Sequence, residues 1–257
     1  MKIISRNPMF RTIEKDQSYG YEKESSCTIH GIFGKTLLLL LLAVAGAAIS
    51  IVMLNGVTDE DHLMTFVGAL IGAMIVALIA GLIANFSRRL CPIFSPIYAI
   101  AEGFMLGFIS LIVDIYYPGI ALTAIVCTFV VTFVMGLLYF TGIVKVGHKF
   151  KTFILVALIS LILGSIILAI LAALNVPGMR DILYDVHNPI GWAIDIILVL
   201  FAALSLLIDF DYAAELADSE ADKKYEWHAA HCLAVGVMYL YVRILELLVR
   251  IAAASKK

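Results

Sequence analysis

The chain has 257 residues, of which 62% are hydrophobic and only 15% charged, and its mean hydropathy is +1.01. This composition excludes an ordinary soluble globular domain and indicates that the hydrocarbon core of a bilayer is the main solvent. The formal net charge is −2, and no basic patch or aromatic platform points to nucleic-acid binding.

Seven apolar runs follow one another, each long enough to cross a membrane at about 20 residues per span. The predicted spans are residues 36–54, 64–86, 92–113, 120–144, 152–174, 189–210 and 231–253. The predicted fold is therefore all-α, a polytopic seven-transmembrane-helix bundle over residues 36–257. The tail at 1–35 is polar and mixed in charge, so we expect the first span, and no cleaved signal peptide, to direct insertion.

Lysine and arginine are distributed unevenly between the connections. Six lie in the tail, two in the second connection, three in the fourth and two in the sixth, which makes 13 of the 18, whereas the first and third connections have none. By the positive-inside rule the N-terminal tail is predicted to be cytoplasmic, and the protein a multi-pass protein of the cell membrane. Lys256 and Lys257 then end outside, unless the seventh run is re-entrant.

Small residues and cysteines have structural interpretations. Gly103 and Gly107 lie four apart in the third span, a spacing that favours close helix packing. The four cysteines show no CxxC spacing and are predicted to be free thiols, so the sequence identifies no metal site.

Six ionisable residues interrupt the later spans, and we expect function there. They are Glu102, Asp195, Asp209, Asp211, Arg243 and Glu246. A charge at mid-bilayer costs at least a few kcal/mol, so such residues usually face a bundle interior or an ion path. With a rise of about 1.5 Å per residue, Glu102 and Arg243 are predicted near the midplane. Acids outnumber the single arginine, which favours a cation over an anion.

Several pairings are open at this level. We expect Glu102 to share Arg243, because no polar neighbour in the sequence can satisfy that carboxylate. Intrahelical pairs of Glu246 with Arg243 or with Arg250 are the alternative, since they are three and four residues apart. Asp211 is also compatible with a helix end in water. Two histidines, His228 and His231, are predicted to be solvated at a helix end.

Several segments resemble a known family. They are SPIYAIAEGFMLGFIS, YYPGIALTAIVCTF, LLYFTGIVKVGHKFK, LLIDFDYAAEL and YEWHAAHCLAVGVMYLYVRILELL, with NPMF and GKTLLLL nearer the start. They are similar to the Bax inhibitor-1 (transmembrane Bax inhibitor motif) family, in its bacterial branch. The resemblance implies a seven-helix bundle with the last helix at its centre, a pH-sensitive calcium leak, and a location in the bacterial inner membrane.

The resemblance also implies a proton sensor, made by an aspartate late in the sixth helix and an acid in the seventh. Asp209 matches the first, but the second position is Arg243, with Glu246 one turn later. We therefore expect an Asp209–Arg243 salt bridge to close the path, with Asp195 and Glu246 attracting the ion from outside.

The predicted function is a leak channel or exchanger for calcium or protons in the lipid bilayer, with no cofactor and no enzymatic activity. An intramembrane hydrolase is disfavoured because all six histidines fall in the tail, connections or helix ends. The alternative is a non-conducting regulator that binds another membrane protein, such as a membrane-bound protease, as the resemblance implies for some relatives.

Overall fold

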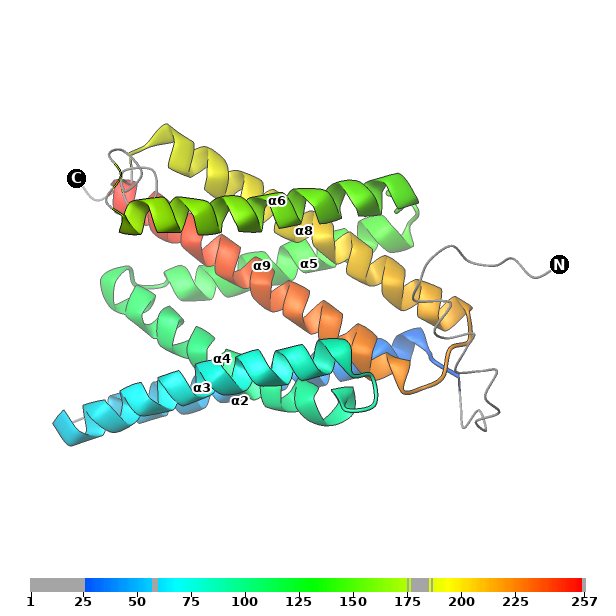
Figure 1. Cartoon of the computed structure of the whole chain (residues 1–257), viewed down its shortest axis with the longest axis horizontal. Helices are drawn as coiled ribbons and strands as arrows, with labels where there is room; N and C mark the ends of the chain where they lie inside the picture. The colour runs from blue at the N-terminus through cyan, green and yellow to red at the C-terminus, as the bar shows by residue number, and fades with distance from the viewer. Residues whose placement is uncertain (1–25, 57–59, 175, 177–184, 186, 256–257) are drawn as a thin grey trace.

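The computed structural model describes residues 26–56, 60–174, 176, 185 and 187–255, and this part of the chain forms seven α-helices. They are α2 (Ile29–Asn55), α3 (Glu60–Phe86), α4 (Cys91–Tyr116), α5 (Ile120–Phe140), α6 (His148–Ala173), α8 (Pro189–Asp218) and α9 (Tyr225–Ser255). All seven are long and apolar enough to cross a membrane. The structure thus confirms the predicted fold class (Figure 1).

Three helices, α2, α8 and α9, extend at least six residues beyond the apolar runs that predicted them. α2 begins at Ile29, because the hydroxyl of Thr28 accepts a hydrogen bond from the Gly31 N–H at 3.1 Å and caps the helix. α8 continues to Asp218, and α9 begins at Tyr225, six residues before the predicted span. Hydropathy marks only the part of a helix that the hydrocarbon surrounds, so the polar ends were missed.

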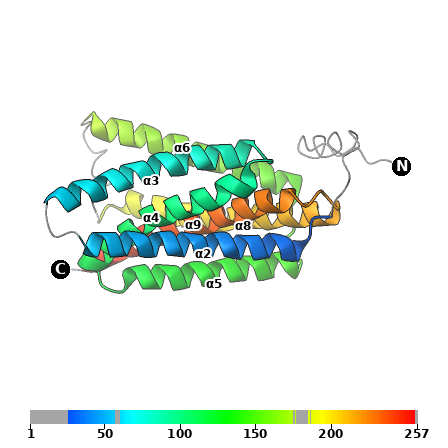
Figure 2. The same cartoon turned by 90° about the horizontal axis from the view of Figure 1, so that it is seen from below.

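The helices lie in three layers, with α9 in the middle one. Figure 2 shows α4, α9 and α8 between α2 and α5 on one side and α3 and α6 on the other. α9 packs against α2, α3, α4, α5 and α8, and its buried residues include Ala229, Ala230, Leu233 and Leu240. The last helix is therefore central, as predicted.

The tightest helix contact joins α2 to α4 through small residues. A Cβ atom on Gly103 would lie 2.0 Å from the carbonyl oxygen of Ala43, and one on Gly107 would lie 2.5 Å from the Cα of Ala47. A Cβ on Gly46 of α2 would lie 2.2 Å from the Ile100 carbonyl oxygen. The backbones approach this closely only because the side chains are absent, which confirms the predicted packing.

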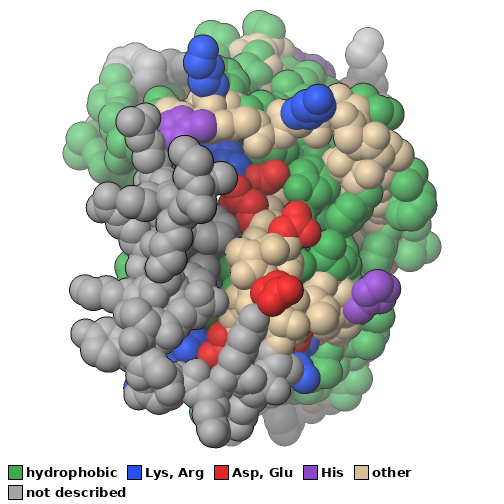
Figure 3. Space-filling view, turned by 90° about the vertical axis from the view of Figure 1, so that its right-hand side faces the viewer, with side chains coloured by type: hydrophobic (Ala, Val, Ile, Leu, Met, Phe, Trp, Pro, Cys, Tyr) green, Lys and Arg blue, Asp and Glu red, His purple; other side chains and the backbone are tan. Residues whose placement is uncertain are grey.

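The two ends of the bundle differ in charge. The basic residues of the described connections and helix starts gather at the end where α2 begins, which we call the basic end: Lys35, Arg88, Arg89, Lys145, Lys149, Lys151, Lys223 and Lys224. Figure 3 looks onto this end and shows acidic side chains near its middle with basic ones around them. The other end, where α9 finishes, is called the opposite end.

Candidate ion site and its surroundings

Asp209 lies on α8 where that helix packs against α9. A Cβ atom on Gly236 of α9 would lie 2.7 Å from a carboxylate oxygen of Asp209 and 2.9 Å from a methyl carbon of Leu206. Gly236 therefore supplies the space that the carboxylate occupies. Within the described residues Asp209 has neither a hydrogen bond nor an ion pair. A half-buried acid between two core helices, without a partner among the described residues, is an unusual polar group.

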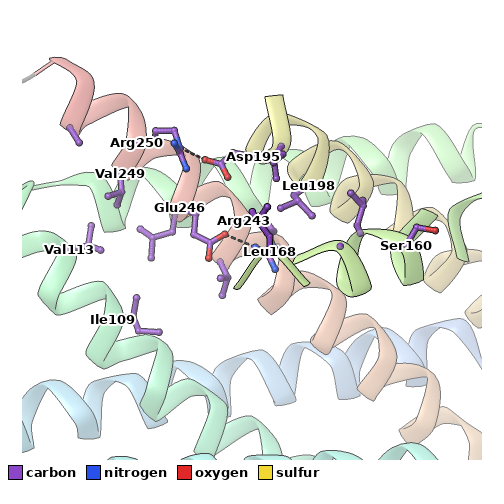
Figure 4. A pocket seen from close by; sticks show the side chains of 16 residues that line it. Ile109, Val113, Ser160, Leu168, Asp195, Leu198, Arg243, Glu246, Val249 and Arg250 are labelled. Atoms are coloured by element: carbon purple, nitrogen blue, oxygen red, sulfur yellow. Dashed lines mark hydrogen bonds and ion pairs between the residues drawn. The ribbon is translucent and has the colours of Figure 1, made fainter. Parts of the chain in front are cut away.

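A cavity of about 760 Å³ opens toward the opposite end, between α6 and the middle layer. Its lining residues come from α4, α6, α8 and α9, and most of them are aliphatic (Figure 4). Among the described residues α6 packs on α8 but on neither α4 nor α9. The wall of the bundle is therefore incomplete at this cavity.

Two ion pairs line the cavity. Arg250 Nε donates to Asp195 Oδ2 at 2.5 Å, and Arg243 Nη1 donates to Glu246 Oε2 at 2.7 Å (Figure 4). Arg250 also donates to the backbone carbonyl of Asp185 at 3.2 Å. Two acids and two arginines leave the lining of this cavity without net charge. Three of the predicted site residues, Asp195, Arg243 and Glu246, are thus brought together.

The expected Asp209–Arg243 salt bridge is not formed. Asp209 contacts α9 at Gly236, and Arg243 lies seven residues further on, about 10.5 Å along the helix axis. The guanidinium instead pairs with Glu246 one turn away and lies over the ring of Tyr239, 4.9 Å from its centroid. The intrahelical alternative was the correct one.

The expected Glu102–Arg243 pair was also wrong. Glu102 lies on α4 and lines a different pocket, between α3 and α4, whereas Arg243 lines the cavity beside α6. Within the described part of the chain Glu102 has no hydrogen bond or ion pair. The two residues also lie at different levels of the bundle, because Arg243 shares its cavity with Ile109 and Val113, about two and three turns beyond Glu102 on α4.

Asp211 is held by a set of polar contacts at the basic end and is not simply exposed to water. It forms an ion pair with Lys151 of α6, and its Oδ1 accepts from the Tyr139 hydroxyl at 3.1 Å. Lys151 also contacts Glu215 at 3.2 Å. These contacts fasten the start of α6 to the end of α8, so they have a structural role.

A second set of contacts at the basic end was not predicted from the sequence. Glu226 of α9 is 1% exposed; it accepts from the Thr28 N–H at 2.9 Å and the Thr28 hydroxyl at 3.1 Å, and it pairs with Lys35. Gly31 leaves room for it, since a Cβ there would lie 2.4 Å from a carboxylate oxygen. The N–H of Cys27 adds a bond to the Ala221 carbonyl at 2.7 Å. We call this set the terminal clasp.

The histidines of α9 are buried, which corrects the expectation that they are solvated. His228 is 4% exposed; its ring contacts the Tyr212 hydroxyl at 3.2 Å and the Asn85 carbonyl at 3.3 Å. His231 is 1% exposed and its ring meets that of Tyr98 edge-on, yet neither of its ring nitrogens has a hydrogen-bond partner among the described residues. Residues 225–232 have the pattern of a polar helix start in water. They are buried because α9 begins inside the bundle, and the sequence pattern does not show that position.

The described part of the chain contains no cluster of metal-ligating side chains. No group of three or more His, Cys, Asp or Glu side chains there could hold a metal ion. The four cysteines are free thiols, as predicted. Burial raises the pKa of the Cys27 thiol to about 11, and the nearby Glu226 charge adds to the rise.

Comparison with known proteins gives one match. No curated protein and no solved structure matches the chain. The model of the family described as Bax inhibitor 1 like matches residues 7–253, which is nearly the whole sequence. With its seven membrane-length helices and central last helix, the chain belongs to the Bax inhibitor 1 like family.

Proposed function

We propose that this protein is a cation leak channel or exchanger, passing calcium or exchanging calcium and protons, in which Asp209 binds the ion. The observation that carries the proposal is the Asp209 carboxylate, unpaired within the described residues at the contact of α8 with the central helix. A buried carboxylate without a partner is costly, and a bound cation or proton relieves that cost.

The cavity beside α6 supplies the approach from the opposite end. Asp195 and Glu246 are each paired with an arginine, so the cavity holds no excess charge to concentrate cations. Selection for a cation therefore rests on Asp209, deeper in the bundle. The Arg243–Glu246 pair lines the cavity, on the turns of α9 that follow the Asp209 contact at Gly236, and its rearrangement would change access to Asp209 without any direct contact.

The distribution of charge supports the orientation proposed from the sequence. The basic residues of the described connections gather at one end of the bundle. We propose that this basic end is cytoplasmic and that the cavity beside α6 faces the outside of a bacterial inner membrane. Labelling of single introduced cysteines from outside should reach position 114 and not position 145.

Calcium flux into liposomes that contain only this protein tests the function. Wild-type protein should conduct above protein-free liposomes, and Asp209→Asn should lower the flux by about tenfold or more, because a charged ligand is lost. Asp218→Asn is the matched control, since Asp218 is an exposed residue near the end of the same helix. Equal flux in wild type and both variants would exclude Asp209 as the ion site.

Absence of flux in the wild type would exclude conduction by this protein alone. Copurification of a membrane-protein partner would then support the regulator that the sequence left as the alternative. That outcome would leave the fold and family unaffected.

A further inference from the structure

A second pocket lies on the other side of the bundle, between α3 and α4. It has a volume of about 500 Å³, within the range of about 300–1,000 Å³ that is usual for small-molecule sites. Its lining is mostly aliphatic, with two methionines, and residues of α3 such as Leu78 and Met74 are more than half exposed at the surface of the bundle. In a membrane this pocket opens toward the lipid.

Glu102 is the one acidic side chain in its lining. It lies about 16.5 Å from the start of α4 at Cys91, so it is well inside the hydrocarbon layer. The other polar groups of the lining are Asn85 and Tyr98, and neither carries a positive charge. The pocket therefore combines an apolar wall with a single uncompensated carboxylate.

The surroundings of Glu102 contain few groups that could change its charge. Tyr98 lies one turn earlier on α4, with its ring against Gly81 of α3, and the ring of His231 of α9 packs against it at 5.1 Å between centroids. The part of α3 that lines the pocket contributes no titratable group. On the other helices packed against α4, Lys35 of α2 is paired with Glu226 of α9, and Arg243 and Glu246 of α9 are paired with each other in the cavity beside α6.

This pocket is separate from the Asp209 site. Among the described residues α8, which carries Asp209, packs against neither α3 nor α4. A ligand of one acid therefore does not contact the other. The lack of a partner among the described residues therefore has to be explained separately for Asp209 and for Glu102.

We propose that the α3–α4 pocket binds a lipophilic organic cation, with Glu102 as the counter-ion and a proton in its place when the pocket is empty. An apolar body would fill the aliphatic wall, and the ring of Tyr98 adds an electron-rich face beside the carboxylate. Arrival from the lipid avoids transfer of the ligand through water. An inorganic ion is a poor fit, because the wall offers it few oxygen ligands.

Binding of tetraphenylphosphonium to the protein in lipid nanodiscs tests this site. We expect saturable binding that weakens as the pH falls, because protons compete for Glu102, and that weakens by about tenfold or more in Glu102→Gln. Glu102→Asp should retain part of the affinity. Asp114→Asn is the matched control, since Asp114 lies on the same helix at the opposite end and outside the pocket. Unchanged affinity in Glu102→Gln, with melting like the wild type, would overturn the proposal.

Modification by dicyclohexylcarbodiimide gives a second readout that needs no variant. This apolar reagent reacts with protonated carboxyl groups in lipid-accessible places, so peptide mass spectrometry should find the adduct on Glu102. Prior addition of tetraphenylphosphonium should suppress the adduct. Modification of the paired acid Asp195 in preference to Glu102, or no protection by tetraphenylphosphonium, would contradict a cation site in this pocket.

Discussion

The acids in the cavity beside α6 and the acid at the contact of α8 with α9 differ in their ion pairing. In the cavity, Asp195 and Glu246 each have an arginine partner. At the helix contact, Asp209 is without a partner among the described residues and lies against a glycine. The sequence predicted one charged path closed by a salt bridge between Asp209 and Arg243. The structure separates a neutral cavity from an acid that still needs a ligand.

This difference indicates which acid can contribute favourable free energy to the binding of an ion. An ion that approached Asp195 or Glu246 would compete with a guanidinium already in place, whereas an ion at Asp209 competes only with a proton or water. The paired acids are therefore expected to contribute to stability, and the unpaired acid to function. The signs of the predicted mutational effects follow from this division.

The largest effect is expected from Arg250→Gln. It leaves Asp195 without its partner, and both side chains are about 15% exposed or less, so we expect a loss of about 3 kcal/mol, the lower end for a broken buried pair. Thermal unfolding in detergent measures it. The double variant Asp195→Asn with Arg250→Gln should recover part of the loss. If the single variant melts like wild type, the cavity is not held by this pair.

Gly236→Ala tests whether the Asp209 carboxylate lies against α9. The added methyl group would sit 2.7 Å from the carboxylate oxygen and 2.9 Å from Leu206, so something must move, at a cost of about 1–3 kcal/mol typical of overpacking. Flux should fall together with the melting temperature. Gly68→Ala on α3, where a Cβ meets no described atom within 4 Å and which lines neither the cavity nor the α3–α4 pocket, is the control and should do neither.

Asp209→Asn should have the opposite sign from Arg250→Gln in a melting experiment. Neutralising a carboxylate that has no partner in the described part of the chain removes a desolvated charge, so we expect stability to be unchanged or raised by about 1 kcal/mol, while flux falls. Such a gain in stability with a loss of activity is typical of a functional position. A clear drop in melting temperature would indicate that Asp209 has a structural partner after all.

The smallest effect concerns the terminal clasp. Because burial and the Glu226 charge raise the pKa of the Cys27 thiol to about 11, nearly all of it is protonated at neutral pH. In a variant with Ala at Cys91, Cys127 and Cys232, the rate of alkylation at Cys27 should keep rising with pH beyond the ordinary thiol range. A plateau near the pKa of a free cysteine, about 8.5, would mean that the clasp is open.

The sequence was sufficient for the architecture because spans and helix contacts depend on local patterns. Seven apolar runs gave seven helices, and the spacing of Gly103 and Gly107 predicted the approach of α4 to α2. The partners of charged residues were harder. Counting residues along each span predicted similar depths for Arg243 and Glu102. Which side chains meet depends on the shift of each helix along the bundle and on its rotation about its own axis, and apolar runs this uniform encode neither.

The buried polar residues of α9 were missed for a related reason. Glu226, His228 and His231 stand before the apolar run, where hydropathy predicts water, yet they lie at the centre of the basic end, enclosed by α2, α3 and α4. Their burial depends on the position of α9 among the other helices. A position in the middle of a bundle is a tertiary property, so a one-dimensional pattern does not reveal it.

The terminal clasp also bears on how the protein is made. Thr28 and Glu226 are 198 residues apart in sequence, so the contact between the start of α2 and α9 forms only after the last helix is made. α2 can enter the bilayer alone with its Thr28 cap, but the Thr28 N–H lacks its carboxylate acceptor until α9 arrives. Completion of the bundle is thereby tied to synthesis of the whole chain, and a truncated product would present an open end to quality-control proteases.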